Sequence, residues 1–424
     1  MIILRSYAYL IFLLVPAFAA GCQDTVYLMP TPSFIASGAH NLFALNPHLK
    51  KNNKISVFYA TNRSPLGKGQ FTNYSIFPGR KISLGVAHLE IGDEKTDWEK
   101  LFNISTTDSM SRRPALYLDR LEELVSLPLP EGITALPEKF QDFVDQINTC
   151  LDNSMDKDIL VYVHGANSTI YRASAHAAQY RHFTGQNSVV LVFLWPSAEN
   201  ILAYGKDVRH ARRSAPAFKH LISILFKHTK AEHINILAYS AGAKIVSPGL
   251  AGLGRDIREK KSEQVKLGEV YFASADIGID TFVENLQSYI DIPRRVTMSV
   301  NMKDSVLKMA WRRHKTSRAG RPDTGDLGEK DAEWIYRAVH DSYLHVISVD
   351  DKTVKGMSPR SHNFWYSHPW VSSDMLVQFM FHMDPLARGL TKKVNGDGLY
   401  FWTFPENYPD RIVEILDRAK QIQN

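Results

Sequence analysis

Cysteine is nearly absent from this chain, whose 424 residues contain only Cys22 and Cys150. The disulfide framework that stabilises many small exported domains is therefore excluded. A chain of this length does not need one, because it can bury a large apolar core. The formal net charge is only +6, and no zinc-finger or other nucleic-acid motif accompanies it. The composition thus argues against a dedicated nucleic-acid-binding protein.

Two kinds of cofactor signature are also missing. The histidines show no metal-ligand spacing, and no glycine-rich nucleotide loop is present, so we expect neither a metal nor another cofactor. Apolar residues make up 44% of the chain and charged residues 22%, which is ordinary for a globular protein. The length suits one large α/β domain with extensions, or two domains.

The N-terminal apolar run is too short for a comfortable membrane span. Arg5 precedes an apolar stretch from Tyr7 to Ala20, and a spanning helix needs about 20 apolar residues. This pattern is typical of a secretory signal peptide. The following A-A-G-C resembles a bacterial lipobox, with Ala19 in place of the usual leucine, and predicts that Cys22 is lipidated. The alternative is an ordinary signal peptide cut near Ala20. Acyl chains on Cys22 would tether the protein to a membrane without a spanning helix.

Buried strands alternate with helical patterns from residue 158 onward. The unbroken apolar runs are typical of strands that are covered on both faces of a parallel sheet. They lie at 159–163, 189–194, 234–239, 269–275, 295–300 and 343–349. Helical spacing of apolar residues follows most of them, so the pattern predicts an α/β fold with a mostly parallel, doubly wound sheet and right-handed crossovers.

A possible nucleophile stands directly after the strand at 234–239. The sequence A-Y-S-A-G places Ser240 between Ala238 and Gly242, close to the G-x-S-x-G pattern of a nucleophile elbow. Small residues are needed two positions before and after the serine, because strand and helix nearly touch there. The alternative is an ordinary strand-to-helix turn that happens to contain serine.

A serine hydroxyl needs a base to accept its proton and an acid to orient that base. On this type of fold the partners arrive in the order serine, acid, histidine. Asp304 follows the second strand after the elbow, and Asp276 follows the first. Both are expected at the carboxyl edge of the sheet. We favour Asp304 and keep Asp276 as the alternative acid. The aspartate that is not part of the triad would be a solvated or helix-capping residue.

His362 is the first histidine after the final predicted strand and is the expected base, with His368 as its rival. His345 lies within that strand and is expected to be structural. The oxyanion of an acyl-transfer intermediate needs two N–H donors. We expect one from the backbone of Ala241, next to the nucleophile, and one from Ala166, after the strand at 159–163.

Several segments together resemble a bacterial group of α/β hydrolases in the esterase/lipase superfamily, mostly of unknown function. The resemblance covers roughly residues 55–384. It rests on V-F-Y-A-T-N-R at 57–63, R-K-I-S-L-G-V-A at 80–87, L-V-Y-V-H-G-A-N at 160–167, V-F-L-W-P-S at 192–197, A-Y-S-A-G at 238–242, A-S-A-D-I-G at 273–278 and S-H-N-F-W-Y-S-H-P-W-V-S-S-D at 361–374. The chain departs from the family pattern at Tyr239, where histidine is usual, and at Ser361, where glycine is usual.

The resemblance implies an α/β-hydrolase fold and places the family histidine on His362. It also implies that residues 54–91 join the same sheet, which gives one domain. Residues 22–50 are rich in proline and polar residues and read as a loop. We therefore expect a signal peptide (1–21), a tether (22–50), a hydrolase domain (51–384) and a C-terminal extension (385–424).

These observations predict an exported, membrane-tethered serine hydrolase of the bacterial envelope, facing the periplasm or the exterior. It would cleave an ester or related acyl substrate, small or lipid-like, through a Ser-Asp-His triad and an acyl-enzyme. Two alternatives stay open. One is a catalytically silent envelope protein that uses the hydrolase fold for binding, and the other is an acyltransferase in which an alcohol replaces water.

Overall fold

The computed structural model describes residues 25–67, 73–108, 112–129, 137–261, 266–396 and 398–423. The predicted signal peptide and Cys22 lie outside the described residues. Within them, the chain forms one 11-stranded sheet. In spatial order its strands are β10 (Thr391–Val394), β11 (Tyr400–Thr403), β9 (Leu344–Ser348), β8 (Arg295–Val300), β7 (Leu267–Ala273), β6 (Ile234–Tyr239), β4 (Ile159–Val163), β5 (Val189–Phe193), β1 (Lys54–Leu66), β2 (Asn73–Ile91) and β3 (Leu116–Pro128).

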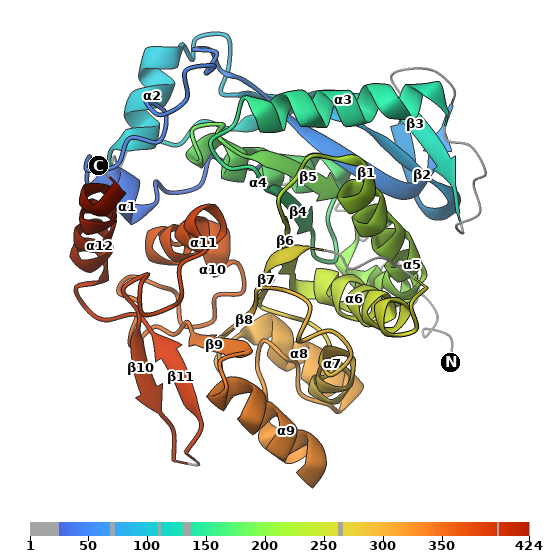
Figure 1. Ribbon diagram of the computed structural model, residues 1–424, viewed down its shortest axis with the longest axis vertical. Coiled ribbons are helices and arrows are strands. Elements are labelled where there is room, and N and C mark those ends of the chain that lie inside the picture. Colours follow the sequence, from blue (N-terminus) through green and yellow to red (C-terminus); the bar gives the residue numbers. More distant parts are fainter. Residues whose placement is uncertain are drawn as a thin grey trace, which may run out of the picture.

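The centre of the sheet is parallel, from β11 through to β1, and antiparallel pairs form both ends. Strands β4 and β5 are wholly buried, as their unbroken aliphatic sequences require. Helices cover both faces (Figure 1). One face packs against α3 (Glu138–Asp152), α5 (Tyr204–His228), α6 (Ala243–Arg258), α7 (Ile279–Leu286) and α9 (Glu329–His340). The predicted α/β-hydrolase fold is confirmed.

The opposite face carries a second apolar core. It packs against α1 (Ser33–Ala36), α2 (Trp98–Thr106), α4 (Ile170–Phe183), α10 (Phe364–Ser367), α11 (Pro369–Phe381) and α12 (Tyr408–Gln423). A further helix, α8 (Ser305–His314), follows β8. None of the helices in the described residues combines the length and the apolar composition that a membrane span requires.

Residues 25–50 are packed, so the prediction of an unpacked tether is wrong for this part. Leu28, Phe34 and Ile35 are buried in the second core. The irregular backbone is satisfied by distant partners, because the Met29 N–H donates to Gln179 at 3.0 Å and Asn46 donates to the Gly185 carbonyl at 2.9 Å. Side-chain partners of this kind replace the ladder hydrogen bonds of regular structure.

Residues 385–423 are also part of the main body, so the boundary predicted at 384 does not separate an extension from it. Strand β11 pairs in parallel with β9 and in antiparallel with β10, which closes that end of the sheet. Tyr408 and Ile412 of α12 are buried in the second core. The described chain is therefore one domain. At the other end of the sheet, residues 54–91 also join it, as the family resemblance implies.

Candidate functional site

Ser240 occupies the sharp turn between β6 and α6. Its backbone φ is +51°, a left-handed value that is uncommon for a residue other than glycine and is a mark of strained functional turns. Gly242 is required because an added Cβ would lie 2.4 Å from the Val163 carbonyl oxygen. Ala238 is fully buried, and its methyl fits where the usual motif has glycine. This is the geometry of a nucleophile elbow.

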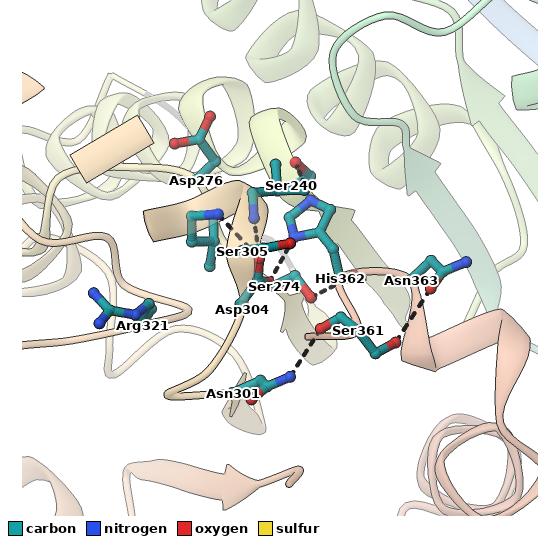
Figure 2. Close-up of polar contacts among 12 residues, drawn as sticks. Ser240, Ser274, Asp276, Asn301, Asp304, Ser305, Arg321, Ser361, His362 and Asn363 are labelled. Atoms are coloured by element: carbon teal, nitrogen blue, oxygen red, sulfur yellow. Dashed lines mark hydrogen bonds and ion pairs between the residues drawn. The ribbon is translucent and has the colours of Figure 1, made fainter. Parts of the chain in front are cut away.

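The turn brings Ser240 to His362, and His362 to Asp304. The Ser240 Oγ lies 2.8 Å from His362 Nε2, and His362 Nδ1 lies 2.6 Å from Asp304 Oδ2. Figure 2 shows the three side chains in this chain of contacts. They follow β6, β8 and β9 in the sequence, and β7 lies between β6 and β8 in the sheet. The carboxyl ends of these strands bring together Ser240 and His362, which are 122 positions apart. The arrangement matches the serine–histidine–acid template in order and contacts.

Asp304 is fully buried and has two structural tasks. Its Oδ2 faces His362, while its Oδ1 accepts hydrogen bonds from the backbone N–H groups of Val306 at 2.9 Å and Leu307 at 3.0 Å. The carboxylate is thus the N-cap of α8 as well as the partner of the histidine. Two backbone donors fix its orientation, so the oxygen that faces His362 cannot rotate freely.

Two further residues hold the loop that carries His362. The Ser274 hydroxyl donates to the His362 carbonyl oxygen at 2.7 Å, and the Asn301 amide donates to the Ser361 carbonyl oxygen at 2.8 Å (Figure 2). Sequence reasoning missed both of them. Their positions in the sequence could have indicated them, because each residue directly follows a strand whose carboxyl end faces the site.

Asp276, the alternative acid, does not contact His362. Its carboxylate pairs with Lys244 at 2.6 Å and with Arg318 at 2.8 Å, and it accepts a hydrogen bond from the Tyr204 hydroxyl at 2.5 Å. Figure 2 shows it pointing away from the histidine. Burial alone would raise the pKa of Asp276, but Lys244 and Arg318 hold it below its usual value. Asp276 is a buried ion-pair centre beside the site.

The two other histidines that the sequence offers have structural places. His368 caps α11 by accepting from the Trp370 N–H at 3.3 Å, and its Nε2 contacts the Lys355 carbonyl oxygen. His345 is buried within β9, and burial lowers its pKa to about 3. The structural role expected for His345 agrees with this, and the geometry places His362, and not its rival His368, beside Ser240.

The expected oxyanion donors lie on both sides of the nucleophile. Ala241 follows Ser240 directly and is buried. Gly165 lies against the serine, because an added Cβ would come within 3.1 Å of Ser240 Cβ. The next residue, Ala166, lines the same cavity as Ser240. The loop after β4 therefore brings its backbone close to the position where an oxyanion would form.

A cavity of about 570 Å³ opens over Ser240 and His362, within the usual size range of small-molecule sites. Apolar and aromatic side chains dominate its lining. The lining residues are Tyr162, Gly165, Ala166, Asn167, Ser168, Arg172, His176, Leu202, Tyr204, Tyr239, Ser240, Asp276, Val306, Met309, Ala310, Arg313, His362 and Tyr366.

At the opposite edge of the sheet, Asp158, His233 and His382 offer possible metal ligands within 4.8 Å of one another. The donor set is already engaged, however. Asp158 pairs with His382 at 3.0 Å and also accepts hydrogen bonds from the His233 N–H and the Asn235 amide. The carboxylates of Asp158 and Glu269 beside it raise the pKa of His382 to about 9. We describe this group as an ion-pair cluster.

The fold and the serine–histidine–aspartate contacts define the α/β hydrolase class. Residues 140–369 match the family described as "Alpha/beta hydrolase of unknown function (DUF900)". This match spans more than half of the chain, and the protein belongs to that family. It is accordingly a hydrolase-superfamily member. No curated protein matches the sequence.

Among solved structures, the chain is similar to a protein from Lactobacillus plantarum WCFS1 that is provisionally described as a cell surface hydrolase. The identity is 11% and the TM-score is 0.28, and the match covers 55% of this chain and 94% of the other.

Proposed function

We propose that the protein is a serine hydrolase that cleaves an ester or related acyl substrate through a covalent acyl-enzyme. The observation that carries the proposal is the continuous contact from Ser240 through His362 to the buried Asp304, with Ser240 and His362 lining a largely apolar cavity. A buried carboxylate that accepts a hydrogen bond from the Nδ1–H group favours the tautomer whose Nε2 accepts the serine proton.

In the first half-reaction the Ser240 oxygen attacks the substrate carbonyl carbon, and its proton passes to His362 Nε2. The N–H groups of Ala166 and Ala241 would hold the resulting oxyanion. The tetrahedral intermediate then collapses, and His362 returns the proton to the leaving alcohol. A water molecule repeats the sequence on the acyl-enzyme, so that the acid product leaves and Ser240 is regenerated.

Labelling with a fluorophosphonate probe tests this proposal. We expect rapid labelling of the wild-type protein and none of Ser240→Ala, because the probe reacts with an activated serine. Ser247→Ala is a matched control, since it removes another fully buried serine hydroxyl, on α6, that the site does not use, and it should still be labelled. Labelling that persists in Ser240→Ala would refute the assignment, and absence of labelling in the wild type would favour the binding-protein alternative.

We also propose that Cys22 is acylated and attaches the protein to the bacterial envelope, facing the periplasm or the exterior. The A-A-G-C sequence supports this, as does the apolar run before it. The chain packs against the body from Val26 onward, so an anchor at Cys22 would keep the domain close to the membrane surface.

Mass spectrometry of the protein isolated from bacterial membranes tests the anchor. The expected result is a mature N-terminus at Cys22 that carries acyl chains, with Cys22→Ala recovered in the soluble fraction. An unmodified N-terminus, or unchanged membrane association of Cys22→Ala, would contradict it.

A further inference from the structure

The cavity over Ser240 has two chemically different parts. An aromatic part contains Tyr162, His176, Tyr239 and Tyr366, with His176 and Tyr366 ring centres 4.2 Å apart. An outer part is formed mainly by Leu202 and by Val306, Met309 and Ala310 of α8, and three of these four side chains are exposed. Figure 1 places α4 and α8 on opposite sides of β6, whose end carries Ser240. Ser240 lines the cavity together with both groups of side chains.

Arg172 is the charged side chain of the aromatic part. It is partly buried, and no carboxylate in the described part of the chain pairs with it. Its place on the first turn of α4 gives no local reason for a cation, because the helix dipole disfavours positive charge there and no acidic residue accompanies it. The neighbouring His176 is neutral, because burial and, to a lesser extent, the positive charge of Arg172 lower its pKa to about 3.

The rest of the cavity does not balance this charge. Among the described residues that line the cavity, Asp276 is the one with an acidic side chain. Lys244 and Arg318 already pair with it. Arg313 adds a second cation at the outer part, where it lies over the Tyr204 ring at 5.6 Å. An anion that enters the aromatic part would meet an arginine and neutral hydroxyl groups in a partly desolvated space, where charge-assisted hydrogen bonds are strong.

On the basis of the proposed hydrolase function, we propose that the substrate is an amphiphilic acyl compound whose negatively charged oxygen group binds Arg172 and whose apolar part lies against α8. Tyr239, which directly precedes the nucleophile, would border the anion subsite. The Tyr239 hydroxyl can donate to an anion without bringing a titratable base to Ser240.

Two esters of matched shape test the subsite. Mono-4-nitrophenyl glutarate carries a free carboxylate, and its methyl ester is neutral. We expect the wild type to have the higher kcat/KM for the charged ester, and Arg172→Gln to lower this preference about tenfold or more, which is the usual weight of a charge-assisted hydrogen bond. Arg172→Lys should keep part of the preference. Arg313→Gln removes the same charge from the outer part and should change the preference by less than about threefold.

An equal loss of both substrates in Arg172→Gln, or the absence of any preference in the wild type, would overturn the subsite while fluorophosphonate labelling of Ser240 still supports the hydrolase. If labelling fails instead, calorimetric titration of the Ser240→Ala protein decides the subsite alone. Hexanoate or hexyl phosphate should then bind at least tenfold more tightly than hexanol, and the additional Arg172→Gln change should abolish the difference. Equal binding of all three compounds overturns the proposal, and the tighter of the two anions identifies the charged group.

Discussion

Replacing Asp304 with asparagine is expected to lower kcat for ester hydrolysis by about four orders of magnitude while the protein stays folded. Asparagine can keep the cap of α8, because its side-chain oxygen can accept from the Val306 and Leu307 N–H groups as Asp304 Oδ1 does. Its amide nitrogen would then face His362 Nδ1, which stabilises the tautomer that cannot accept the proton of Ser240. Steady-state kinetics and far-ultraviolet circular dichroism measure the two expectations.

Asp276→Asn is the matched control for this prediction. It also removes one buried carboxylate beside the cavity, but its partners are Lys244 and Arg318 instead of the histidine. We expect a fall in thermal stability, because the buried Arg318 and the largely buried Lys244 lose their counter-charge, and a much smaller loss of kcat in the folded protein. A loss of kcat as large as that of Asp304→Asn would return Asp276 to the triad.

The sequence predicts the positions of the site residues along the chain and favours Asp304 as the acid, but it leaves Asp276 open as the alternative. Ser240, Asp304 and His362 each follow a buried strand, so parallel topology alone brings them to one edge. Asp276 satisfies the same rule. The two aspartates differ in the side chains that surround them. Asp276 is paired with Lys244 of α6 and with Arg318 of a loop, and only the tertiary fold brings these two cations together.

The central fold is predicted well because its strands are covered on both faces and read as unbroken apolar runs. Strand β3 is missed for the opposite reason. It pairs with β2 alone at the edge of the sheet, and Asp119, Arg120 and Glu123 interrupt its apolar pattern. Residues 25–50 are missed because their proline and glycine content argues against regular structure but does not prevent burial. Phe34 is buried, and it lies in the short helix α1.

Arg388→Met is expected to lower the free energy of unfolding by about 3–5 kcal/mol, because it leaves the Asp374 carboxylate buried without its counter-charge. Both side chains are fully buried, with Arg388 Nε 2.7 Å and Nη2 3.3 Å from the two Asp374 oxygens. The pair joins α11 to the segment after residue 384, which the sequence marks as a separate extension. Urea unfolding, followed by tryptophan fluorescence, measures the loss.

The double variant Asp374→Leu/Arg388→Met separates the contribution of the pair's charges to stability from the contribution of its packing volume. Apolar residues of similar size often replace a buried ion pair without loss of stability, so the double variant should regain most of what the single variant loses. Recovery would mean that residues 385–423 are held as part of the core and that the ion pair mainly excludes other arrangements of the segment. If the single variant loses less than about 1 kcal/mol, water reaches Asp374 and this end of the sheet packs less tightly than the described contacts require.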